Sequence, residues 1–64
     1  MKRTKLLQVL NQMGVVFVRR GRKHDVYKQP VTKIETTVPR YDEIKEFTAR
    51  SIIKTLTPVV NEPS

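Results

Sequence analysis

The sequence has no cysteine and no tryptophan, contains a single histidine, and lacks any long apolar run. Without cysteine there is neither a disulfide framework nor a thiol nucleophile, and one histidine among scattered carboxylates does not make a zinc site. No apolar stretch approaches the roughly 20 residues that a membrane span needs, and the basic start lacks the apolar segment of a signal peptide. We therefore expect a cytoplasmic protein, not associated with a membrane, that needs no metal or other cofactor.

The chain is short and strongly basic. Its 64 residues suffice for one domain at most. The net charge is +7, and residues 1–33 contain nine Lys or Arg against one acid, which gives +8, whereas residues 34–64 contain four against five, which gives −1. Charge segregated in this way favours a polyanionic partner, because each phosphate that is neutralised releases condensed counterions. Nucleic acid is the first class of partner to consider, and a solubilising surface is the alternative.

Two segments have the 3.6-residue periodicity of amphipathic helices. The first is predicted over residues 4–13, with Thr4 as its N-cap and Gly14 as the residue that ends it. The second has Thr48 as a candidate cap and ends before Pro58, and residues 42–47 could form a short helical turn before it. The apolar positions are Leu6, Val9, Leu10 and Met13 in the first helix and Ala49, Ile52, Ile53 and Leu56 in the second.

The segments between these helices favour strands. Residues 15–18, Val-Val-Phe-Val, are too short and too β-branched for a helix and are predicted to form a buried strand. A hairpin turn over residues 19–23, centred on Gly21, leads to a return strand at residues 24–28, and residues 34–38 alternate as a third strand. The order α-β-β-β-α predicts an α+β fold in which two helices cover one face of a three-stranded antiparallel sheet.

The basic turn is the most distinctive stretch for function. Its cations surround Gly21, and the only histidine, His24, follows directly. From the residues alone, a lone histidine beside a basic turn is most often a polar strand residue, and the cations are then a solvated turn. The functional alternative is that the cations hold an anion on which the histidine acts.

Three features together resemble the HicA toxin family, small ribonucleases that are partners of HicB antitoxins. A first helix closes at Gly14 before an apolar strand, a basic glycine turn leads to His24 with Tyr27 three residues on, and TTVPR at residues 36–40 is followed by RSIIK at residues 50–54. The resemblance covers roughly residues 3–56. Departures from the family pattern are Arg22-Lys23 where relatives often have Gly-Ser, Tyr41 where a histidine often follows TVPR, and Phe47-Thr48-Ala49 where a glycine is usual.

This resemblance implies a fold similar to double-stranded-RNA-binding domains and an mRNA-cleaving activity that depends on one histidine, here His24. It implies a HicB-type antitoxin as protein partner. Residues 1–33, with a charge of +8, are a natural electrostatic target for such a protein. We expect a single HicA-like domain over residues 1–57 and a flexible C-terminal tail over residues 58–64.

The chemistry needs few groups because RNA carries its own nucleophile. Loss of the proton from a 2′-hydroxyl lets that oxygen attack the adjacent phosphorus, and histidine is the side chain that titrates near neutrality. His24 is therefore the predicted catalytic residue, with neighbouring cations stabilising charge on the phosphate. The candidate RNA-binding residues are Arg19, Arg20, Arg22, Lys23, Lys28 and Arg40.

Several residues of the chain allow a second interpretation. On an ideal strand Tyr27 faces away from His24, which favours core packing over base stacking. Arg40 could reach RNA or an acidic antitoxin, whereas Arg50 and Lys54, one turn apart, are typical of a solvated helix face. The chain could also be a non-catalytic module that binds double-stranded RNA through its cations. A DNA-binding protein is less favoured, since neither helix concentrates the basic residues.

Overall fold

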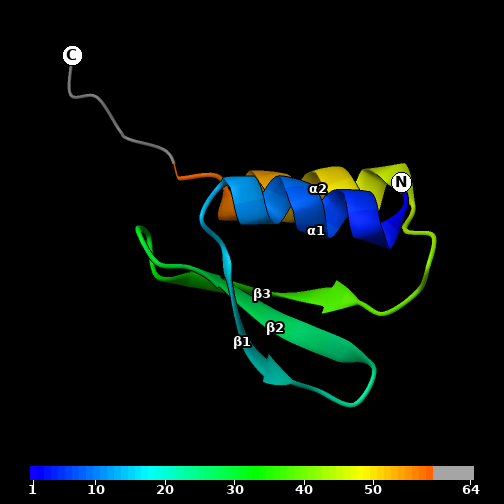
Figure 1. Ribbon diagram of the computed structural model, residues 1–64, viewed down its shortest axis with the longest axis horizontal. Helices are drawn as coiled ribbons and strands as arrows, with labels where there is room; N and C mark the ends of the chain where they lie inside the picture. Colours follow the sequence, from blue (N-terminus) through cyan, green and yellow to red (C-terminus); the bar gives the residue numbers. More distant parts are fainter. Residues whose placement is uncertain (59–64) are drawn as a thin grey trace.

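The computed structural model describes residues 1–58, in the order α1 (Arg3–Gln12), β1 (Val16–Arg20), β2 (His24–Gln29), β3 (Ile34–Pro39) and α2 (Glu46–Leu56) (Figure 1). The predicted α+β class and α-β-β-β-α order are confirmed. The predicted tail lies, beyond Pro58, outside the described residues. Within the described part of the chain, neither helix has the length and apolar composition that crossing a bilayer requires.

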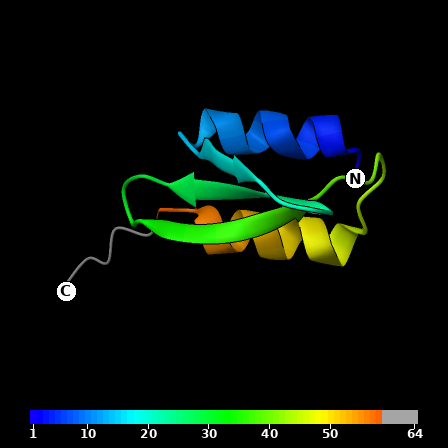
Figure 2. The same ribbon diagram turned by 90° about the horizontal axis from the view of Figure 1, so that it is seen from below.

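The three strands form one antiparallel sheet in the order β1-β2-β3, and both helices pack on the same face of it (Figures 1 and 2). Figure 2 shows α1 and α2 running alongside each other, with α2 behind β3. The core lies between these two layers, and the predicted helical stripes supply five of its members. It consists of Leu6, Leu10, Val15, Val38, Ile44, Ala49, Ile52 and Leu56. No helix of residues 1–58 covers the opposite face of the sheet, and we call it the open face.

Strand β1 is not the buried strand that its composition predicts. All five of its residues are exposed, and its apolar members Val16, Phe17 and Val18 are 46%, 54% and 39% exposed. The strand is an edge of the sheet and bends away from the helices (Figure 1), so that only Val15, just before it, joins the core. Phe17 packs edge-to-face on Tyr27, with ring centroids 5.6 Å apart. Tyr27 itself packs against the core, as predicted.

Both helices begin without the predicted caps. The first starts at Arg3 and the second at Glu46, and neither has a side-chain hydrogen bond at its N-terminus. Thr4 and Thr48 therefore lie inside their helices, and the prediction of both as caps is wrong.

Residues 42–45 do not form the predicted helical turn, and residues 46 and 47 are the first two residues of α2. Lys2 and Glu43 form an isolated antiparallel bridge, and the backbone N–H of Arg3 donates to the carbonyl of Asp42 at 2.9 Å. Pairing with the start of the chain keeps residues 42–45 out of a helix, and this pairing takes the place of a capping side chain in setting where both helices begin.

The other ends of the helices are fixed by a glycine and a buried glutamine. α1 ends at Gln12, and Gly14, the residue predicted to end it, has a φ of 82°, which favours glycine. Gln29 at the end of β2 is fully buried, and its Nε2 donates to the carbonyls of Met13 and Leu56, each at 3.0 Å. Its Oε1 accepts from the N–H of Val31 at 3.2 Å. One side chain thereby joins the last turns of both helices to the sheet.

Candidate functional site

The loop between β1 and β2 comprises only residues 21–23, because β1 continues to Arg20. The N–H of Gly21 donates to the carbonyl of His24 at 2.8 Å. A Cβ atom on residue 21 would collide with that same carbonyl oxygen, so the loop can close this tightly only with glycine. The loop thus fixes the backbone of His24 at the first position of β2.

The side chain of His24 belongs to the open face of the sheet. Side chains alternate along a strand, and the next residue, Asp25, points to the helix side, where it binds Arg3 of α1. His24 and Val26 therefore project to the other side, and Thr37 of β3 pairs with Val26 on that same face. His24 is exposed to solvent.

A shallow hollow of about 390 Å³ opens around His24. Val26 lies at its base, only 8% exposed although it is outside the core cluster. The lining residues are Arg19, Gly21, Arg22, Lys23, His24, Val26 and Thr37. They include three cations and no carboxylate, so the hollow suits an anion. Within residues 1–58 no three His, Cys, Asp or Glu side chains lie close enough together to hold a metal ion.

The position of Arg19 in this hollow depends on an irregularity in β1. The register shifts at Val18, so that Arg19 instead of Val18 pairs with Val26. An extra residue in one strand reverses the alternation of faces beyond it. In a regular strand Arg19 would pair with Asp25 and face the helices. The bulge therefore adds a cation to the open face beside the histidine.

Three of the six predicted RNA-binding residues, Arg19, Arg22 and Lys23, line the hollow with His24. The remaining three do not. Arg20 is exposed at the end of β1 and pairs with Asp25, whereas Lys28 lies farther along β2, paired with Glu35.

Arg40, the last of the six, is part of a network behind the hollow. Its Nε donates to Asp25 Oδ1 at 2.9 Å, and its Nη2 donates to the carbonyl of Gly21. Arg3 donates through Nη2 to Asp25 Oδ2 at 2.9 Å and through Nε to the carbonyl of Pro39 at 2.8 Å. The Asp25 side chain is only 13% exposed, which strengthens both ion pairs relative to surface pairs. The network joins the glycine loop, the end of β3 and the first turn of α1.

Sequence reasoning missed Val26 and Thr37 as members of the site and Arg3 as a support of it. Alternation along β2 and β3 could have placed Val26 and Thr37 on the face of His24, but only with the strand register known. The contact between Arg3 and Asp25 spans 22 residues and leaves no local signal in the sequence.

The residues of the hollow and of the Asp25 network all lie within one segment that matches a known family. The family model described as HicA toxin of bacterial toxin-antitoxin matches residues 3–57. This chain belongs to the HicA toxin family. The match confirms the resemblance predicted over residues 3–56, and it runs from the start of α1 to just past the end of α2. Comparisons with curated proteins and with solved structures gave no match.

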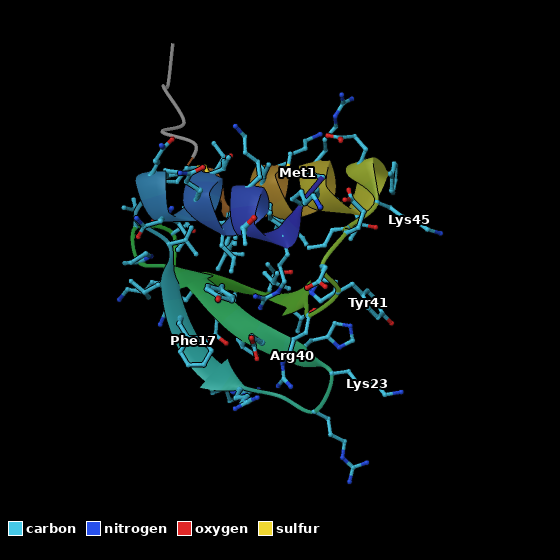
Figure 3. The ribbon with its side chains drawn as sticks, turned by 45° about the vertical axis from the view of Figure 1, so that its right-hand side comes forward. Met1, Phe17, Lys23, Arg40, Tyr41 and Lys45 are labelled. Carbon is cyan, nitrogen blue, oxygen red and sulfur yellow. The ribbon has the colours of Figure 1, made fainter. Side chains whose placement is uncertain are left out.

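Membership assigns the chain to a family of toxins of bacterial toxin-antitoxin systems. The HicA match includes the glycine loop, the hollow and the Asp25 network, to which α1 contributes Arg3. Figure 3 shows Lys23 at the loop projecting into solvent, on the side of the molecule away from Phe17. The HicA fold in this chain therefore presents its basic loop without obstruction from either helix.

Proposed function

We propose that this chain is a metal-independent endoribonuclease that cleaves mRNA with His24 as its catalytic base, and that a HicB-type antitoxin silences it. The observation that carries the proposal is the placement of the only histidine in a hollow with three cations and no carboxylate. Membership in a toxin family supports it, because mRNA cleavage is a direct way to stop cell growth. The active domain is residues 1–57, and the place of action is the cytoplasm, where mRNA is translated.

The reaction follows from the groups in the hollow. An unprotonated imidazole nitrogen of His24 accepts the proton of a 2′-hydroxyl, and O2′ forms a bond to the adjacent phosphorus while the bond from phosphorus to the 5′-oxygen breaks. The 5′-oxygen takes a proton from solvent, which leaves a 2′,3′-cyclic phosphate and a 5′-hydroxyl. Arg19, Arg22 and Lys23 stabilise the charge on the non-bridging oxygens. General-base catalysis of this kind contributes about 10²- to 10⁴-fold to a rate.

The test is cleavage of a labelled single-stranded mRNA in excess EDTA by wild type and His24→Ala, with the termini of the products identified. Wild type should produce cyclic phosphate and 5′-hydroxyl ends, and His24→Ala should be slower by at least about 100-fold while keeping its RNA affinity. Cleavage by His24→Ala at the wild-type rate would refute the catalytic assignment.

A charge control separates catalysis from binding. Lys33 lies in the loop between β2 and β3, at the other end of these strands from His24, and is exposed. Lys33→Gln and Lys23→Gln remove the same charge from the protein. Only Lys23→Gln should slow cleavage, because only Lys23 lines the hollow around His24.

The second candidate function is a non-catalytic module that binds double-stranded RNA. The observation that favours it is the order α-β-β-β-α with both helices on one face, which is consistent with domains of that kind. Tight binding of duplex RNA by wild type and by His24→Ala, with no cleavage by either, would establish this function instead.

The antitoxin partner is tested separately. We expect an acidic protein encoded next to this chain to co-purify with it and to compete with RNA for the basic hollow. Lys23→Glu should weaken that complex more than Lys33→Glu does, because only Lys23 lies beside His24. Absence of any neighbouring gene product from a pull-down would count against the pairing.

A further inference from the structure

A second hollow adjoins the first and contains an exposed aromatic ring. Its volume is about 470 Å³, and it is lined by Arg22, Lys23, Arg40 and Tyr41. Arg22 and Lys23 also line the hollow around His24, so the two hollows share one pair of cations. Tyr41 is 70% exposed. Figure 3 shows Tyr41 and Lys23 projecting into solvent on the same side of the molecule.

The position of Tyr41 relative to His24 is set by the sheet. Pro39 pairs with His24, and Tyr41 follows two residues later. Paired Cα atoms lie roughly 5 Å apart in an antiparallel ladder, and two extended residues advance the chain by roughly 7 Å. The ring is therefore close to the histidine but outside its hollow.

The residue before Tyr41 ties this segment to the glycine loop. Arg40 binds Asp25 and the carbonyl of Gly21 through its guanidinium group. Because one guanidinium group contacts both Gly21 of the loop and Asp25 of β2, the backbone next to Tyr41 is held at a defined distance from the loop. An exposed aromatic side chain on a braced segment loses little conformational freedom when a ligand stacks on it.

We propose that Tyr41 is a stacking platform for a nucleobase of single-stranded RNA, next to the nucleotide whose phosphate lies at His24. Nonspecific single-strand binding sites combine a cationic groove with aromatic rings on which bases stack. Here Arg22 and Lys23 hold the backbone between the two hollows, and Tyr41 receives the base. The inference rests on the proposed RNA-cleaving function and names its substrate class.

Stacking on Tyr41 selects against duplex RNA. In a helix the faces of the bases are covered by their neighbours, and a protein reaches only phosphates, 2′-hydroxyls and base edges. A base must leave the stack before its face can cover the tyrosine ring. The substrate that fits both hollows is thus an unpaired segment of mRNA, such as a loop or a single-stranded stretch between helices.

Phe47 provides a matched control within the same chain. It is also exposed, at 85%, and also lies beside cations, in a hollow lined by Arg50, Ser51 and Lys54. That hollow shares no residue with the one around His24. Phe47 is therefore more exposed than Tyr41 and lies beside two cations where Tyr41 lies beside three, but it is not adjacent to the histidine.

The experiment measures binding of a single-stranded 2′-O-methyl RNA that contains 2-aminopurine, by the full-length chain. Methylation of O2′ removes the nucleophile, so binding is read without cleavage, and 2-aminopurine fluorescence falls when the base stacks. Tyr41→Ala should bind about 5- to 150-fold more weakly and lose the quenching. Tyr41→Phe should retain both, and Phe47→Ala should match wild type. A 2′-O-methyl duplex of the same sequence should bind wild type and Tyr41→Ala equally.

The outcomes separate this inference from the function on which it rests. Failure of wild type to bind the single strand would overturn both. Binding with quenching by wild type and equally by Tyr41→Ala would overturn the platform alone and leave His24 catalysis standing. If Tyr41→Ala weakened only the antitoxin complex, Tyr41 would be a protein contact and the inference would be wrong.

Discussion

His24 and Asp25 are neighbours in the chain, but their side chains lie on opposite faces of the sheet. The imidazole lines the open hollow, whereas the carboxylate is held by Arg3 and Arg40 on the helix side. The sheet thus separates the group proposed for catalysis from the acid that could otherwise pair with it. Substitutions on the helix side should therefore change stability, and substitutions on the open face should change cleavage.

Asp25→Asn should destabilise the fold by about 2–3 kcal/mol. The change leaves two partly buried guanidinium groups next to each other without their shared counter-charge. The free energy of unfolding in urea measures the loss. Asp42→Asn makes the same chemical change at an exposed side chain and should stay within about 0.5 kcal/mol of wild type. Equal effects of the two variants would show that the network contributes nothing to stability.

The two glycines should respond differently to alanine. Gly14→Ala has open space for its Cβ but a positive φ, so it should lose about 1–2 kcal/mol of stability and cleave RNA normally. Gly21→Ala forces the His24 carbonyl to move, and displacement of a catalytic group costs on the order of 100-fold in rate. Cleavage by the two variants at a temperature where both are folded checks this difference. Normal cleavage by Gly21→Ala would contradict it.

Salt dependence should identify the cations that bind phosphate. For single-stranded nucleic acid, the slope of log affinity against log salt changes by about 0.7 for each phosphate that the protein neutralises. Arg22→Gln should make the slope of binding to the uncleavable RNA shallower by that amount, because Arg22 lines both hollows. Lys33→Gln should leave the slope unchanged, and a shallower slope in both variants would indicate a diffuse charge effect.

The contact between the Met1 amino group and Glu43 Oε2, 2.7 Å apart, should make stability depend on pH at both extremes. This hydrogen bond raises the pKa of the amino group above its usual 8.0 and lowers the pKa of Glu43 below its usual 4.5. A lowered acid pKa contributes stability above pH 4.5 that is lost on acidification, and a raised amine pKa contributes stability below pH 8.0 that is lost as pH rises.

The thermal midpoint of Glu43→Gln should therefore lie below that of wild type between about pH 5 and 8, and the two should converge as the pH falls through the lowered pKa of Glu43. The Glu43 side chain is 65% exposed, so the difference should be small and should shrink in high salt. A difference that does not shrink as the pH falls below 4.5 would exclude the ion pair as its cause.

The sequence predicted the elements that local patterns specify. Helical periodicity located α1 and α2, and Gly14 marked the end of the first. Their starts were mispredicted because pairing between the beginning of the chain and residues 42–44 determines them, and such pairing leaves no capping residue to find.

The site was also predictable only where its residues are close together in the sequence. The turn, its cations and His24 are contiguous, so their proximity was visible in the sequence, and cleavage by His24 stays a prediction. Val26 and Thr37 join them only through strand register, and Arg19 reaches the open face through a bulge that composition does not encode. The exposure of β1 depends on where the helices lie, which no pattern within the Val-Val-Phe-Val stretch could reveal.

The exposed edge of β1 has a consequence for handling the protein in concentrated solution. Its apolar side chains and free backbone groups would favour pairing between copies, but each copy has a net charge of +7 and repels the next. At 1 M salt the screening length falls to about 3 Å, and this repulsion disappears. A high-salt wash, which removes nucleic acid from basic proteins, is therefore the condition in which self-association is strongest, so the washed protein should be returned to low ionic strength before it is concentrated.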